Sequence, residues 1–174
     1  MDNSADVRRR GRLIFRGGVT LLIMGAIFFF SAQPSGDSSR LSEFLLNTEF
    51  GQLLMRLLPS LSDQGDAHDI RKYAHMTEFF CLGVSALMFA RELFRGKARR
   101  GLLSLSAAWL FCLFYACTDE VHQLFVEGRS CQLSDVGVDG IGFTAGMLVC
   151  LAALLLARPL MSETKRPPEE GGTE

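Results

Sequence analysis

Apolar residues in this chain gather into long blocks instead of alternating with polar residues. Four of these blocks carry almost no charge and have the length that an α-helix needs to cross a hydrocarbon layer. Alternation with a period of two, the mark of a half-buried strand, is not the dominant pattern. We therefore predict four transmembrane helices, at about residues 13–32, 73–90, 101–117 and 136–157.

The helix boundaries follow from local signals. Residues 30–32 place bulky Phe30 where a signal-peptide cleavage site needs a small residue, so we predict that the first helix is a retained anchor. The third helix is expected to continue towards Phe125, with a stop near Gly128. Ser134 is the expected N-cap of the fourth helix, which should end at Ala157, before Pro159.

The connection between the first two spans has a helical pattern of its own. Residues 41–58 repeat apolar positions along one stripe but are too polar to span a membrane. This predicts an amphipathic helix lying in the outer interface. The alternative is a helix that packs on the other helices through the same stripe. After Pro59, residues 60–69 carry three aspartates and are expected to form a solvated loop.

The predicted fold class is therefore an all-α integral membrane protein, with four transmembrane helices plus an outer amphipathic interfacial helix. The chain has 174 residues, about the size of one domain. We divide it into a basic cytoplasmic N-terminus (1–12), a four-helix membrane domain (13–157) and a disordered cytoplasmic tail (158–174).

The distribution of basic residues predicts an orientation. Both chain ends and the 91–100 loop together hold thirteen of the 18 Lys and Arg residues. The positive-inside rule then puts both termini in the cytoplasm of a bacterium, with the protein in its inner (cytoplasmic) membrane. Because topology accounts for the basic residues, we expect no nucleic-acid partner, and membrane lipids are the expected surroundings.

Ionisable residues gather at the predicted outer ends of helices two, three and four, where unpaired charge is costly in a membrane. The pattern at 135, 139, 142 and 146 places two aspartates and two glycines on one helix face, and Gly142 and Gly146 form a small-xxx-small motif for close helix approach. The candidate catalytic residues are His75, Glu78, Asp119, Glu120 and His122. The candidate ligand-binding residues are Lys72, Gln123, Arg129, Asp135 and Asp139.

These segments resemble the VanZ-like family of small bacterial membrane proteins. The resemblance is carried by Lys72-Tyr-Ala-His75-Met-Thr-Glu78-Phe, by residues 118–129 ending in Gly-Arg, and by Asp135-Val-Gly-Val-Asp139-Gly-Ile-Gly142. Residues 31–34, Ser-Ala-Gln-Pro, fit it too, and the resemblance covers about residues 15–155. It implies a cell-envelope context, because the family's named member is associated with resistance to the glycopeptide teicoplanin. It implies no particular reaction.

Three interpretations of the cluster remain open at this point. The first is an outer site where Lys72 and Arg129 hold an anionic molecule, such as a lipid-linked or peptidoglycan-related precursor. The second is a network of salt bridges that only pins helix ends. The third is a membrane enzyme with His75 or His122 as general base beside a carboxylate.

Neither a metal nor a cofactor is assigned from the sequence. His75, Glu78, Asp119 and His122 would make a ligand set suited to zinc, but histidines near carboxylates are more often hydrogen-bonded partners. The five cysteines have no CxxC spacing. We expect free thiols, with Cys117 and Cys131 as the one pairing to consider.

Overall fold

The computed structural model describes residues 3–34, 66–129 and 131–163, together with five single positions between 44 and 52. Within this part of the chain there are four long helices and no strand, and all four are long and apolar enough to cross a membrane. They are α1 (Asn3–Ser31), α4 (Asp66–Leu93), α5 (Arg100–Gln123) and α6 (Leu133–Glu163). The predicted all-α, four-span fold is confirmed. Most of the predicted amphipathic helix at 41–58 lies outside the described residues.

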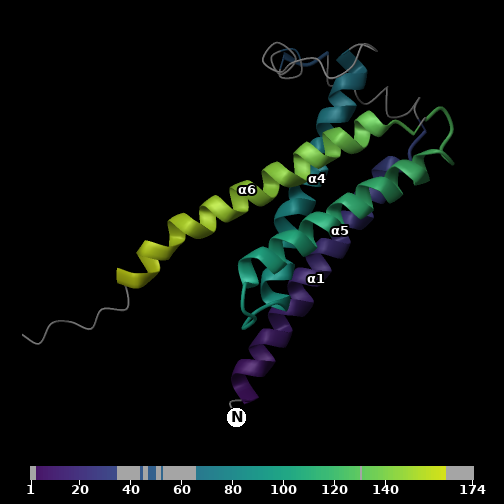
Figure 1. Cartoon of the computed structure of the whole chain (residues 1–174). Helices are drawn as coiled ribbons and strands as arrows, with labels where there is room; N and C mark the ends of the chain where they lie inside the picture. The colour runs from purple at the N-terminus through teal and green to yellow at the C-terminus, as the bar shows by residue number, and fades with distance from the viewer. Residues whose placement is uncertain are drawn as a thin grey trace, which may run out of the picture.

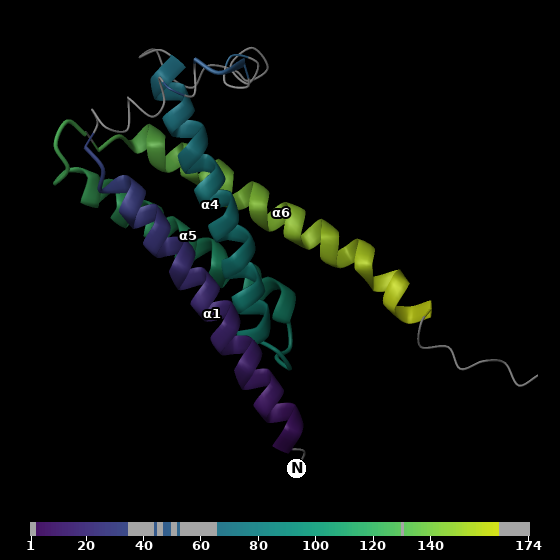
Figure 2. The ribbon, with the colours of Figure 1, turned by 180° about the vertical axis from the view of Figure 1, so that it is seen from behind.

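Helix α4 is the centre of the bundle, because its contacts with α1, α5 and α6 are each more extensive than any contact between the other three helices. Figures 1 and 2 show α1 and α5 side by side, while the C-terminal half of α6 leaves the bundle. The α5–α6 loop and the start of α4 lie at one end of the molecule, which we call the polar end. The N-terminus and the α4–α5 loop lie towards the other end, the basic end (Figure 1).

Side-chain burial fits a bundle surrounded by lipid. The fully buried apolar side chains come from all four helices, among them Ile27, Phe79, Cys112 and Phe143. Many large apolar side chains face outward along the full length of the helices. In water such a surface would be an aggregation risk, but in a bilayer it is the face that lipid tails cover.

Glycines allow α4 and α6 to approach backbone to backbone. A Cβ placed on Gly142 would overlap the carbonyl of Met76, and one on Gly146 would overlap the carbonyl of Phe80. Gly83 of α4 meets the backbone of α6 in the same way. The close approach predicted for Gly142 and Gly146 is confirmed, and it brings the acidic start of α6 against α4.

Several predicted boundaries are wrong. Helix α1 begins at Asn3 and so includes most of the basic N-terminal segment. Helix α4 begins at Asp66, and Asp69, predicted in a solvated loop, is buried. Helix α6 starts at Leu133, one residue before the predicted cap Ser134, and continues past Pro159 to Glu163. Amphipathic or polar helix ends that contact other helices escape a rule that follows hydropathy alone.

The basic end is held by one buried carboxylate. Glu92 of α4 forms ion pairs with Arg12 and Arg16 of α1 at 3.2 Å, and with Arg95 at 3.1 Å. Arg16 also donates to the carbonyl of Met88 at 3.0 Å. Burial of a carboxylate is tolerated when several charged donors surround it. These contacts explain why the helix of α1 extends through the basic segment.

Candidate functional site

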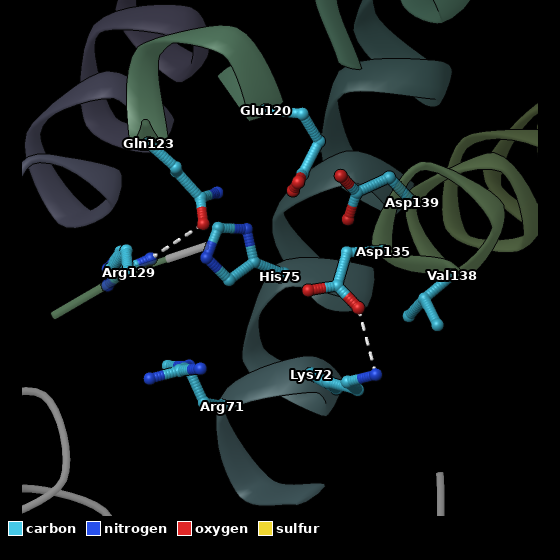
Figure 3. Close-up of a pocket in the computed structure, with 9 residues that line it drawn as sticks. All are labelled: Arg71, Lys72, His75, Glu120, Gln123, Arg129, Asp135, Val138 and Asp139. Carbon is cyan, nitrogen blue, oxygen red and sulfur yellow. Dashed lines mark hydrogen bonds and ion pairs between the residues drawn. The ribbon is translucent and has the colours of Figure 1, made fainter. Parts of the chain in front are cut away.

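A polar cavity lies inside the polar end of the bundle, between α4, α5, α6 and the α5–α6 loop. Its volume is about 20 Å³, room for one water molecule. We call this cavity the polar chamber, and Figure 3 shows its walls. The residues that line it are Arg71, Lys72, His75, Glu120, Gln123, Arg129, Asp135, Val138 and Asp139. Seven of these nine were candidate site residues in the sequence.

Lys72 and Asp135 close one side of the chamber. The Lys72 Nζ lies 2.8 Å from the Asp135 Oδ1, and the side chain of Lys72 is only 8% exposed. The pair joins the first turns of α4 to the first turn of α6. It is the kind of contact that the pinning interpretation predicts.

Arg129, in the α5–α6 loop, ties that loop to α1 and α5. Its Nε donates to the carbonyl of Gln33 at 3.1 Å, and its two terminal nitrogens donate to the carbonyl of Phe30 and to Gln123 Oε1, both at 3.3 Å. Burial lowers the pKa of Arg129 from its usual value, the adjacent charge of Arg71 lowers it further, and nearby carboxylates, Asp119 first, raise it. The guanidinium remains charged at neutral pH, because an arginine loses its proton only above about pH 12.

Two neighbouring acids of α5 hold the helices together in different ways. The Oδ2 of Asp119 accepts hydrogen bonds from Ser31 of α1 at 2.9 Å and from Gln123 at 3.0 Å. The Oε2 of Glu120 accepts the backbone N–H of Gln132, just before α6, at 3.0 Å. Both side chains are buried. They fix α5 against α1 on one side and α6 on the other.

One histidine and two aspartates converge in the interior. A nitrogen of His75 and carboxylate oxygens of Asp119 and Asp139 lie within 4.8 Å of one another. The three residues come from α4, α5 and α6, so only the tertiary fold brings them together. We call them the His–Asp cluster. An imidazole beside two carboxylates is suited to proton transfer or to cation binding.

Two further candidate catalytic residues belong neither to the chamber lining nor to the His–Asp cluster. The ring of His122 stacks on Phe28 of α1, with ring centroids 4.3 Å apart. Glu78 is one turn further along α4 than His75, and its Oε2 is buried with no hydrogen-bond partner. The zinc-type set considered from the sequence therefore does not form as a unit. Instead of that set, the structure brings Asp139 together with His75 and Asp119.

Some contributors had no clear signal in the sequence. Arg71 was visible one turn before His75 but was not assigned to a site. Ser31 belongs to the segment 31–34 that fits the family resemblance but was not assigned to a site, yet it is fully buried and bonds to Asp119. A polar residue closing an apolar run is the signal that would have found it. Cys117 and Cys131 are both free thiols, and so are the other three cysteines.

These features define a class: a multi-pass α-helical membrane protein with a buried polar site at one end of its bundle. The family model VanZ/LLP1 matches residues 18–156, which include parts of all four spans and every residue of the chamber. The chain belongs to the VanZ-like family. No match was found among curated proteins or among solved structures.

Proposed function

We propose that this VanZ-like protein acts in the cell envelope by binding an anionic, phosphate-bearing or peptidoglycan-related molecule at the polar end. The observation that carries the proposal is the pair of arginines at the chamber, Arg71 and Arg129. Both are partly exposed, whereas the acids behind them, Glu120 and Asp139, are buried. The arginines therefore mark the accessible side of the chamber.

The arrangement of charge suits an anion. In Figure 3, Arg71 and Arg129 lie on one side of His75, while Glu120 and Asp139 lie on the other. Two partly exposed guanidinium groups beside each other attract an anion. Guanidinium groups bind phosphate and carboxylate oxygens with two parallel hydrogen bonds, which gives both affinity and orientation. Arg129 has five N–H donors, of which its three observed bonds use three.

The size of the chamber limits how the ligand binds. A volume of about 20 Å³ admits a water molecule but not a sugar or a whole head group. The charged group of the ligand therefore docks at the arginines, and the rest of the molecule lies in the membrane interface outside. An envelope lipid fits this requirement, because its phosphate lies at the depth where helix ends meet water.

The pinning interpretation is the second candidate, and one observation favours it. Lys72 pairs with Asp135 inside the bundle, and this contact supports a structural role for the lysine. We accordingly assign the ligand-binding role to Arg71 and Arg129 and the pinning role to Lys72.

The proposed site requires that the protein lies in the bacterial inner membrane with its polar end facing outward and both termini in the cytoplasm. Cys131 is an exposed free thiol at the polar end, and Lys97 is exposed at the basic end. A membrane-impermeant maleimide should label Cys131 in intact cells. It should label Lys97→Cys, in a Cys131→Ser background, only after permeabilisation. The reverse pattern would place the chamber in the cytoplasm.

The envelope role is tested by glycopeptide susceptibility of a sensitive bacterium that expresses the protein. We expect wild type to reduce teicoplanin susceptibility, and we expect Arg71→Gln to remove most of that effect without changing membrane abundance. Arg91→Gln, a charge loss near the other end of α4, is the matched control and should behave as wild type. An effect of Arg71→Gln that merely follows its abundance would favour pinning over binding.

A further inference from the structure

The His–Asp cluster has buried oxygens that are left without a partner. The Oδ1 of Asp119 and the Oδ2 of Asp139 have no hydrogen-bond partner, and both residues are at most 3% exposed. A buried polar atom without a partner destabilises a fold, and a charged one does so more strongly. Two such atoms beside one imidazole need either a shared proton or a cation.

The outer contacts of the cluster resemble those of a metal-binding carboxylate. Asp119 is fixed through Oδ2 by Ser31 and Gln123, which leaves Oδ1 buried and without a hydrogen-bond partner. Ligands in metal sites are oriented by hydrogen bonds of this kind to their second atom. His75 and Asp139 also line the polar chamber, whose volume of about 20 Å³ has room for a coordinated water.

The charge balance favours a divalent ion. The acids here are Asp119, Glu120 and Asp139, which are buried, and Glu78, which is partly buried. The cations beside them are Arg71 and Arg129. Lys72 is already matched by Asp135. If the acids are ionised, they outnumber the two arginines by two, and one divalent cation would neutralise this excess; an anion bound at the arginines would add to the negative charge that the cation balances.

The spacing is compatible with coordination. Ligand atoms about 2.1 Å from an ion lie roughly 3–4 Å apart. The cluster spans up to 4.8 Å, so side-chain shifts of about 1 Å or less would close it. One imidazole with two carboxylates is a hard-to-borderline ligand set, which suits Zn²⁺ or Mn²⁺.

We propose that His75, Asp119 and Asp139 bind one divalent cation, Mn²⁺ or Zn²⁺, with a water from the polar chamber as a further ligand. This site is separate from the arginine pair and does not rest on the proposed envelope function. A cation behind the arginines would also hold α4, α5 and α6 together at the polar end.

The test uses full-length protein purified in detergent, stripped with a chelator and titrated with Mn²⁺, with free Mn²⁺ counted by electron paramagnetic resonance. Wild type should bind one Mn²⁺ per chain, displaceable by Zn²⁺. Asp139→Asn and His75→Asn should weaken binding about 100-fold, and Ser31→Ala, which loosens Asp119, about tenfold. His122→Asn is the matched histidine control and should bind as wild type.

The wild-type protein offers a readout that does not depend on whether the variants fold. Its spin-echo spectrum should show coupling of Mn²⁺ to one imidazole nitrogen, and the coupling should persist in His122→Asn. A folded wild type that binds neither Mn²⁺ nor Zn²⁺, or binding that His75→Asn and Asp139→Asn leave unchanged, would overturn the proposal and assign the cluster to a shared proton or to adventitious binding. No lipid is added, so failure of the anion-binding proposal leaves this result intact.

Discussion

Gly142→Leu is expected to remove most of the folded protein from membranes. The new side chain would start where the carbonyl of Met76 now lies, and backbone cannot move aside as a flexible side chain can. Helices α4 and α6 would be forced apart, which loses the close packing that holds membrane helices together. Overpacking of this kind costs about 1–3 kcal/mol or more, enough to lower abundance several-fold. Detergent-extracted monodisperse protein, measured by size-exclusion chromatography, is the readout.

The control for this change lies on the same helix. A Cβ on Gly137 meets nothing within 4 Å, so Gly137→Leu adds the same side chain towards lipid. It should be recovered at close to the wild-type level. Equal recovery of Gly142→Leu and Gly137→Leu would mean that α6 does not pack on α4 through this face.

Lys72→Met is expected to destabilise the protein strongly, because it leaves Asp135 without its cation. Removing one partner of a buried ion pair costs about 3–5 kcal/mol. The side chain of Asp135 is 21% exposed, so we expect about 2–3 kcal/mol here, after allowance for its remaining hydration. Thermal unfolding in detergent should show the loss as a clear drop in midpoint.

The double variant Lys72→Met/Asp135→Asn separates pairing from other roles of the lysine. It removes both charges, so it should recover most of the lost midpoint. Lys97→Met, on the exposed α4–α5 loop, controls for loss of a lysine. If the double variant were as unstable as Lys72→Met, the Lys72–Asp135 pair would not be the stabilising contact.

Hydropathy alone predicted the fold class, because apolar blocks of membrane-spanning length permit few other structures. Helical spacing predicted the glycine face of α6, since Gly142 and Gly146 lie on one side of the helix and have the smallest side chain. Hydropathy did not predict where the helices begin and end. The segments of α1 and α4 beyond the apolar blocks are polar, and they are helical because of tertiary contacts such as the pairs of Arg12 and Arg16 with Glu92.

The candidate site was predicted as a region and not as an arrangement. Polar residues at three helix ends and in the α5–α6 loop had to share one end of the bundle, and seven of the predicted site residues line one chamber. Which side chains would meet was not determined by their spacing. His122 is next to the acids in sequence but stacks on Phe28, while His75 meets Asp119 and Asp139 across three helices. The rotation of each helix about its axis determines which side chains meet, and this rotation could not be predicted from the local sequence.

The most direct test of the anion-binding claim is native mass spectrometry of the protein released from mild detergent after purification from bacterial membranes. The account predicts that wild type and Arg91→Gln each retain one anionic, phosphate-bearing or peptidoglycan-related molecule, and that Arg71→Gln loses at least about nine-tenths of it, since a bidentate charged contact is removed. A wild-type protein that retains no such molecule, or equal retention by Arg71→Gln, would contradict it.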